Sequence, residues 1–284
     1  MIGGKKYMHN NISLIGGDNR NIELAKLLIK DCCNVKVYGL EDVELKKYTY
    51  DKLENAVEDS EIIVLGIPVM QDNDLIKASV PTSLTHLLTC INENQKVYGG
   101  VIKDKLLSGL QKKNIEYFDF MKSEEFAIMN TIPTVEGAIE FAIRETNITL
   151  HDANVLVLGF GRIGKLLSKI LKDLGSKVEV TARKQEDFAW IDTYGYAKVK
   201  YSELDERLEK YDIIFNTIPT MILDKERLEN VNKESLIIDL AAKPGGVDFD
   251  VANDIGIKTN WALALPGKVA PKSAAKYMKN ILLK

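Results

Sequence analysis

Val155-Leu-Val-Leu-Gly159-Phe-Gly161-Arg-Ile-Gly164-Lys-Leu-Leu167 decides the fold of this 284-residue chain. An apolar run leads into three glycines spaced G-x-G-x-x-G, and a helical pattern follows. The first glycine allows a tight strand-to-helix turn, the second lets a pyrophosphate approach, and the third lets the helix pack on the strand. Unpaired N–H groups at the helix start favour an anion. We therefore predict a dinucleotide site at Gly159, Phe160, Gly161, Arg162, Ile163 and Gly164, in preference to a turn that binds nothing.

The next strand, Lys177 to Thr181, indicates which dinucleotide binds. In an NAD site this region usually supplies an Asp or Glu that binds the ribose hydroxyl groups. Here Thr181 ends the strand, and Arg183 and Lys184 follow it. A guanidinium and an ammonium group suit a 2′-phosphate. The sequence favours NADP, while NAD stays open because solvated loops carry such cations too.

Two later strands, 212–216 and 235–239, complete the α/β pattern of the second half. Ligands of open parallel sheets bind beyond the carboxyl ends of the strands. Asn216 ends one of these strands and Asp239 the other, so we expect the following residues to reach the cofactor and Asn216 to reach the substrate. The expected cofactor contacts are Thr217, Ile218, Pro219, Leu240 and Ala241, in addition to Thr181, Arg183 and Lys184.

The first half repeats the pattern without the full glycine motif. Short apolar runs predict parallel strands at 12–15, 35–38, 61–68, 96–100 and 115–120. The predicted fold is α/β, with two Rossmann-like domains that have parallel sheets, are joined by crossover helices and are separated by a cleft. Residues 1–129 form a substrate or partner domain to which a helix at 266–284 returns. Residues 130–265 form the NAD(P)-binding domain with its linker helix.

Polar residues near the predicted cleft are candidates for substrate binding. Asp18 and Arg20 open a helix, so Asp18 is either an N-cap or part of a carboxylate site with Arg20. Asn130 and Thr134 begin the linker helix, and Lys268 follows a Leu-Pro-Gly sequence near the end. The candidate substrate residues are Asp18, Arg20, Asn130, Thr134, Asn216 and Lys268.

Composition excludes several classes of protein. The net charge is −3 and the basic residues are dispersed, which argues against nucleic acid as a partner. No segment resembles a signal peptide or a membrane span, and three cysteines, two of them adjacent, suit reduced thiols in the cytoplasm. None of the three histidines follows the glycine motif, which argues against a 2-hydroxy-acid dehydrogenase. No His, Cys and carboxylate set has zinc-ligand spacing, so no metal is expected.

Six motifs follow one another in a fixed order over nearly the whole chain. They are Gly16-Gly-Asp-x-Arg20, Asn130-x-x-Pro133-Thr134-Val-Glu136-Gly-Ala-Ile139, Gly159-Phe-Gly-Arg-Ile-Gly164, Asn216-Thr-Ile-Pro219, Asp239-Leu-Ala-x-x-Pro-Gly-Gly246 and Leu265-Pro-Gly-Lys268-Val-Ala-Pro271. Their combination, which is far more specific than any one motif, resembles the dipicolinate synthase A-subunit family. The extended start before Ile12 departs from the family pattern.

The resemblance implies an NADP-dependent oxidoreductase that converts a dihydrodipicolinate-type intermediate to pyridine-2,6-dicarboxylate during sporulation. It also implies a small dicarboxylate substrate, a partner in the flavoprotein-like B-subunit of the synthase, and the cytoplasm of the mother cell of a sporulating bacterium. Aromatisation supplies driving force, so a strong general base is dispensable, and the catalytic residues remain unknown. Two alternatives stay open: a shikimate-dehydrogenase-like NADP reductase, suggested by Asn216 to Pro219, and a non-catalytic dinucleotide-sensing module. The sequence does not decide the oligomeric state, and a homo-oligomer stays open.

Overall fold

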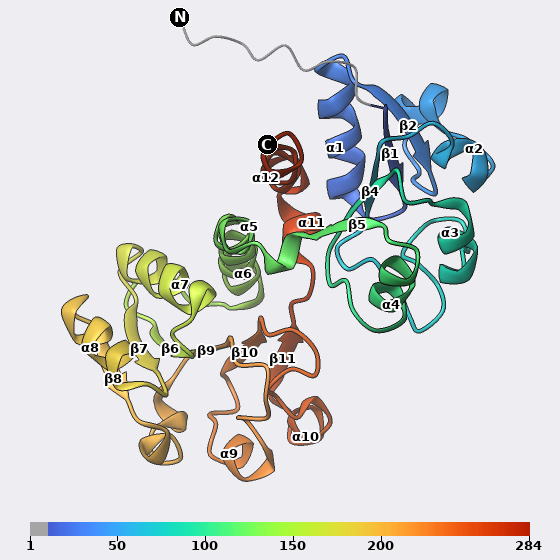
Figure 1. Cartoon of the computed structure of the whole chain (residues 1–284). Helices are drawn as coiled ribbons and strands as arrows, with labels where there is room; N and C mark the ends of the chain where they lie inside the picture. Colours follow the sequence, from blue (N-terminus) through green and yellow to red (C-terminus); the bar gives the residue numbers. More distant parts are fainter. Residues whose placement is uncertain (1–10) are drawn as a thin grey trace, which may run out of the picture. The chain divides into compact units, whose positions relative to one another are not determined.

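The computed structural model describes residues 11–284, which divide into two α/β units (Figure 1). The first unit runs to Asn130 and resumes from Pro266 to Lys284, and the second spans Thr131–Leu265. Each contains one parallel sheet, of five and six strands respectively, which confirms the predicted class of two Rossmann-like domains. The departure before Ile12 falls mainly on residues 1–10, outside the described residues.

The first unit contains all five strands that the sequence predicts, in the order β2-β1-β3-β4-β5. The strands are β1 (Asn11–Ile15), β2 (Asn34–Tyr38), β3 (Ile62–Leu65), β4 (Lys96–Gly99) and β5 (Glu116–Asp119). The helices are α1 (Asn19–Lys30), α2 (Leu53–Val57), α3 (Leu84–Cys90), α4 (Asp104–Lys112), α5 (Glu124–Met129), α11 (Leu265–Val269) and α12 (Pro271–Leu282), with 3-10 turns at Val43–Tyr48 and Phe120–Lys122.

The C-terminal helix α12 completes the hydrophobic core of the first unit. Its buried Ala275, Met278 and Leu282 belong to the same apolar cluster as Leu24 and Leu28 of α1. Burying a side chain of the size of Met or Leu contributes about 1.5–3 kcal/mol. The end of the chain therefore helps to hold the first unit together, although more than one hundred residues of the second unit separate it from α5.

The second unit has six strands in the order β11-β10-β9-β6-β7-β8. They are β6 (Asn154–Leu158), β7 (Lys177–Thr181), β8 (Ala197–Val199), β9 (Ile213–Asn216), β10 (Leu236–Asp239) and β11 (Lys258–Trp261). The helices are α6 (Thr131–Glu145), α7 (Arg162–Asp173), α8 (Gln185–Thr193), α9 (Lys225–Glu229) and α10 (Phe249–Asp254), and the 3-10 turns are Tyr201–Glu203 and Leu208–Lys210. The sequence analysis missed these two edge strands, because β8 has only three residues and β11 is largely polar, so neither forms an apolar run.

The carboxyl ends of the four central strands of the second unit lie in register. Leu158 of β6 pairs with Thr181 on one side and with Asn216 on the other, and Asn216 pairs with Asp239 of β10. The strands around them are apolar and buried, as expected where helices cover both faces. One edge of the sheet therefore carries all the predicted cofactor residues.

Among the described residues, no helix has both the length and the apolar character needed to cross a membrane.

We predict that Gly164→Ala destabilises the second unit, whereas Gly161→Ala does not. A Cβ atom at residue 164 would lie 2.1 Å from the Gly159 carbonyl oxygen, whereas nothing lies within 4 Å of a Cβ atom at residue 161. Overpacking at Gly164 should lower the free energy of unfolding by about 1–3 kcal/mol. Gly161→Ala should change it by less than about 1 kcal/mol. Urea unfolding followed by circular dichroism measures both values, and equal losses would contradict the packing argument.

Candidate functional site

The glycine turn between β6 and α7 has the geometry of a phosphate site. Gly159 has φ +98°, a left-handed conformation that favours glycine, and its missing side chain leaves room for the Thr217 hydroxyl. Gly161 is the N-cap of the twelve-residue α7 and supplies no side-chain cap. Phe160 is buried, Ile163 is half-buried and Arg162 is exposed. The start of α7 therefore suits an anion, and the space beside Gly161 is open, with no atom within 4 Å of an added Cβ.

The end of β7 supports this turn and carries two cations. The buried Thr181 hydroxyl accepts a 3.1 Å hydrogen bond from the Gly159 N–H, so Thr181 stabilises the glycine turn. Arg183 and Lys184 are exposed beyond it, and Lys184 Nζ lies 3.7 Å from a carboxylate oxygen of Glu186. These residues could meet a negatively charged group on the ribose of a bound dinucleotide.

Glu179 of β7 is bound to residues of its own unit. Its carboxylate accepts hydrogen bonds from Arg207, Lys210 and Tyr211. Burial opposes its ionisation, but these donors, Lys210 foremost, hold the pKa of Glu179 below its usual value. Glu179 is thus an ionised structural group and does not supply the carboxylate typical of an NAD site.

A buried polar network fixes the loops after β9 and β10. Asn216 Nδ2 donates to Asp239 Oδ1 at 2.8 Å and to the Ile218 carbonyl at 3.0 Å. Asp239 also accepts hydrogen bonds from the N–H groups of Ala241 and Gly246, both at 2.8 Å. Burial raises the pKa of Asp239 although these donors oppose that shift. Asn216 is fully buried, so in this structure it orders the loops that carry the cofactor candidates.

The remaining cofactor candidates lie along the same two loops. Thr217 donates through its hydroxyl to the Leu158 carbonyl, which ties the loop to the glycine turn. Ile218 is half-buried and Pro219 is exposed. Leu240 and Ala241 are buried just beyond β10. The predicted cofactor residues are therefore gathered at one edge of the second sheet.

The first unit has a cluster of charges after β1, formed by Asp18, Arg20 and Lys77. Asp18 is the N-cap of α1, which was one of the two roles that the sequence left open for it. Its side chain accepts a hydrogen bond from the Arg20 N–H. The Arg20 guanidinium, 3% exposed, donates to both Asp18 oxygens at 2.9 and 2.7 Å and also to the Ile67 carbonyl. Lys77 Nζ donates to Asp18 Oδ2 at 2.9 Å. We call these three residues the Asp18 cluster.

Lys77 is a site residue that sequence reasoning missed. It lies 59 positions from Asp18 in no motif, and only the fold brings the two together. Its side chain is 31% exposed, so it is more accessible than that of Arg20. Burial opposes the ionisation of Asp18, but the hydrogen bonds and charge of Arg20, and then those of Lys77, hold its pKa well below the usual range. The cluster is thus an ionised carboxylate held by two cations.

Lys268 follows Gly267 of α11, whose backbone comes close to the Asp18 cluster. A Cβ atom on Gly267 would lie 3.0 Å from Asp18 Oδ1, so the backbone approaches the carboxylate closely there. Lys268 follows and is exposed. Asn130 is the C-cap of α5, and Thr134 is buried in the first turns of α6. These two residues mark the junction between the units, Asn130 in the first and Thr134 in the second.

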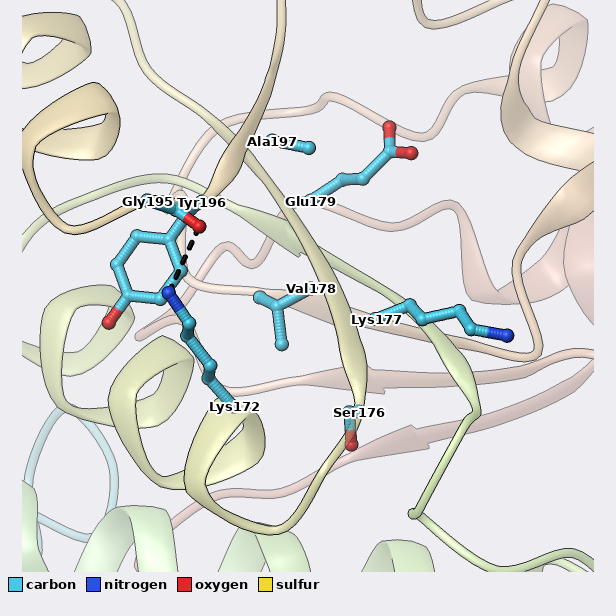
Figure 2. Close-up of a pocket in the computed structure, with 8 residues that line it drawn as sticks. All are labelled: Lys172, Ser176, Lys177, Val178, Glu179, Gly195, Tyr196 and Ala197. Carbon is cyan, nitrogen blue, oxygen red and sulfur yellow. Dashed lines mark hydrogen bonds between the residues drawn. The ribbon is translucent and has the colours of Figure 1, made fainter.

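A surface pocket of the second unit lies away from these residues (Figure 2). It is open and is lined by Lys172, Ser176, Lys177, Val178, Glu179, Gly195, Tyr196 and Ala197. Lys172 crosses it and donates to the Gly195 carbonyl at 3.0 Å. Because Lys177 and Ala197 begin β7 and β8, the pocket is at the amino-terminal edge of the sheet, opposite the edge where α/β sheets bind dinucleotides.

Comparison with known proteins gives matches in both units. A family model described as the N-terminal domain of the dipicolinate synthase A-subunit matches residues 11–121, and one described as shikimate / quinate 5-dehydrogenase matches residues 140–259. The dipicolinate synthase A-subunit of Bacillus subtilis (strain 168) is 31% identical, and the match covers 96% of this chain and 94% of that protein.

The chain belongs to the dipicolinate synthase A-subunit family.

Crystal structures of the family agree with this assignment. The A chain of dipicolinate synthase from Bacillus subtilis is 30% identical with a TM-score of 0.84, covering 97% of this chain and 95% of the other. The A-subunit from Bacillus halodurans is 30% identical with a TM-score of 0.87, covering 96% of each chain. A transhydrogenase from Sinorhizobium meliloti, 16% identical with a TM-score of 0.67 and covering 96% and 93%, shares the fold. Together with the dehydrogenase-type cofactor unit, family membership makes the chain an oxidoreductase that uses a nicotinamide dinucleotide.

We predict that Asp18→Asn removes an acid-sensitive part of the stability. The pKa of Asp18 is lower in the folded chain than in the unfolded one, so its ionisation stabilises the fold above the unfolded pKa of about 3.9. That contribution is lost as the pH falls through this value towards the folded pKa. The stability difference between wild type and Asp18→Asn should therefore be largest near neutral pH and shrink below about pH 4.

Urea unfolding at a series of pH values measures this difference. Glu93→Gln is the matched control, since it neutralises an exposed carboxylate of the same unit. A difference for Asp18→Asn that is constant from neutral pH to about pH 3 would contradict the assignment.

Proposed function

We propose that this chain is the dehydrogenase component of a dipicolinate synthase and oxidises a dihydrodipicolinate-type intermediate to pyridine-2,6-dicarboxylate with NADP. The observation that carries the proposal is an open glycine turn at the start of α7 in a chain that matches a member of this family over 96% of its length. A bound NADP⁺ would supply the hydride acceptor. The protein has to hold the substrate and the cofactor in the reacting orientation.

The reaction removes a hydride and a proton from the dihydropyridine ring. One ring carbon would give up a hydride to the acceptor, a proton would leave the ring for solvent, and the new double bond would complete the aromatic system. Aromatisation makes the step favourable, so a strong general base is not needed. This agrees with the location of His86 and His151, which are both exposed and outside the strand-end sites; His9 lies outside the described residues. We assign no catalytic residue.

We propose NADP as the preferred cofactor because of charges near the end of β7. Arg183 and Lys184 are exposed there, and the nearest carboxylate of that strand, Glu179, is held by three donors of its own unit. A 2′-phosphate would meet two cations and no competing acid of the strand. NAD is the alternative outcome of the cofactor test below.

The substrate carboxylates, in this proposal, bind at the Asp18 cluster. Lys77 and Lys268 are accessible cations, and Arg20 holds Asp18 so that the ammonium group of Lys77 is oriented. A dicarboxylate shielded from water needs cationic partners, because an unpaired buried carboxylate is costly. Asn130, Thr134 and Asn216 remain candidate substrate contacts, although Thr134 and Asn216 are buried in this structure.

Further parts of the proposal concern the cell and the partner protein. Because the Bacillus subtilis relative is named as one component of dipicolinate synthase, we propose that the chain acts with the flavoprotein-like B-subunit of that enzyme. The proposed location is the cytoplasm of the mother cell during sporulation. A small dicarboxylate is the proposed substrate, and nucleic acid and membranes are not proposed as partners. Self-association into a homo-oligomer is left to measurement.

A shikimate-dehydrogenase-like reductase is the second candidate within enzymes. The shikimate / quinate 5-dehydrogenase match supports it, but that match is confined to residues 140–259, and the first unit matches the dipicolinate synthase family instead. A dinucleotide sensor would bind cofactor without consuming it. Purified chain is mixed with NADP⁺ and either the cyclic product of dihydrodipicolinate synthase or shikimate, with and without the B-subunit, which distinguishes the three. NADPH and dipicolinate formed together support the proposal; shikimate oxidation or binding without turnover refutes it.

We predict that Arg183→Ala weakens NADP binding by about 1.5–3 kcal/mol, roughly tenfold to one hundredfold, because a hydrogen-bonded charge is lost. NAD affinity should change little. Lys169→Ala is the matched control, since Lys169 is an exposed cation of α7 whose partner is Asp173. Fluorescence titration with each reduced cofactor gives the affinities. Equal losses for NADP and NAD would reject the 2′-phosphate assignment.

We predict that Lys77→Met and Lys268→Met each lower kcat/KM for the substrate by about tenfold or more, because each removes a charge-assisted contact. NADP affinity should stay within about twofold. Arg20→Met should lower kcat/KM and also stability, since it leaves Asp18 partly unpaired. Lys105→Met changes an exposed lysine paired with Asp74 and should have no effect. Wild-type kcat/KM in both lysine variants would place the carboxylate site elsewhere.

A further inference from the structure

A second group of reactive side chains lies on α2 and α3 of the first unit. Glu54 belongs to α2, and His86 and Cys90 belong to α3. One carboxylate oxygen, one imidazole nitrogen and the thiol sulfur lie within 4.8 Å of one another. We propose that these three side chains bind a transition-metal ion, with Zn²⁺ as the ion that fits best. The proposal is independent of the dehydrogenase function.

Helix geometry explains why His86 and Cys90 converge. Residues four positions apart lie on the same face of an α-helix, so both side chains leave α3 in the same direction. The other face of α3 is anchored, because Leu84 and Leu87 are buried in the core. The Ser83 hydroxyl caps the helix by accepting a hydrogen bond from the His86 N–H. Two of the three ligands therefore belong to a helix whose position is fixed by its packing and its N-cap.

The third ligand comes from a helix that packs against α3. In α2, Leu53, Ala56 and Val57 are buried, and Glu54 is on the exposed side. Its Oε1 lies 2.7 Å from His86 Nε2, so the two groups already face each other. Glu54 and His86 are exposed and Cys90 is half-buried, which leaves an approach from solvent.

The distances need only small adjustments to bind zinc. Bonds of about 2.0–2.2 Å to nitrogen and oxygen and about 2.3 Å to sulfur place tetrahedral ligand atoms roughly 3.3–3.6 Å apart. The Glu54–His86 separation of 2.7 Å is somewhat shorter than this range, and the Cys90 sulfur lies within 4.8 Å of both other atoms. Rotations of exposed side chains can supply the difference, and water would take the fourth position.

The types of donor atom select the metal. A thiolate, an imidazole and a carboxylate together suit Zn²⁺ or Co²⁺, whereas Mg²⁺ and Ca²⁺ prefer oxygen ligands alone. Because the ligands come from two helices, a bound ion would link α2 to α3. It would stabilise the first unit, since it binds the folded state and not the unfolded one.

This site departs from the sequence-based expectation of no metal. The spacing His86-x-x-x-Cys90 supplies only two ligands, and Glu54 is 32 positions away from His86 in the chain. Packing of α2 on α3 is what completes the set.

The test uses untagged, chelator-treated full-length protein titrated with Co²⁺. We expect one equivalent to bind with a thiolate-to-cobalt charge-transfer band in the near ultraviolet, and Zn²⁺ to displace it. Cys90→Ser should abolish the band. His86→Gln and Glu54→Gln should weaken binding by about tenfold or more, at least the loss caused by removing an outer partner of a metal ligand. Cys33→Ser is the matched control, because Cys33 is a half-buried thiol outside the cluster.

A second readout tests whether the metal stabilises the folded protein by linking α2 to α3. Zn²⁺ should raise the unfolding midpoint of wild type and Cys33→Ser, and should not raise that of His86→Gln. Circular dichroism checks that each variant is folded before titration. The absence of a band in wild type, or a band that survives Cys90→Ser, would overturn the proposal. Pyridine-2,6-dicarboxylate, itself a chelator through nitrogen and two carboxylates, is left out of these mixtures.

Discussion

The close approach of α7 to β6 is the constraint on which the proposed cofactor site depends. Any side chain at Gly164 would meet the Gly159 carbonyl oxygen, so the helix can begin where it does only because this residue has none. The turn is then fixed from two neighbouring strands: Thr181 accepts from the Gly159 N–H, and the Thr217 hydroxyl donates to Leu158. These contacts fix the position of the first turn of α7, whose unpaired N–H groups favour an anion.

Polar residues at the strand ends follow one physical rule in both units. A buried charge or amide must have partners, and each supplied partner fixes a loop. In the second unit, Asp239 joins the loop after β9 to the loop after β10 through Asn216 and backbone N–H groups. In the first unit, Asp18 joins the start of α1 to Lys77, and the backbone at Gly267 packs close to its carboxylate. Buried pairs of this kind add little net stability, but removing one partner is costly.

The sequence alone determined the class of fold and the position of the glycine turn before α7. Apolar runs with short spacing indicated every interior strand of both sheets, because buried parallel strands are apolar along their whole length. The spacing of Gly159, Gly161 and Gly164 defined the turn, because each glycine meets a separate local steric need. The order of six motifs also indicated the family, which the match over 96% of the chain confirmed. The sequence did not indicate the edge strands β8 and β11, because β8 has only three residues and β11 is largely polar.

Tertiary structure decided how distant side chains combine. Lys77 joins Asp18 across 59 positions, and Glu54 joins His86 across 32, with no local signal for either pair. It also showed that Arg20 and Asn216, candidates on sequence grounds for touching a substrate, are buried and hold neighbouring groups in place. A sequence reports residue types and local periodicity. Which charge faces which, and which polar group is removed from water, depends on the packing of elements far apart in the chain.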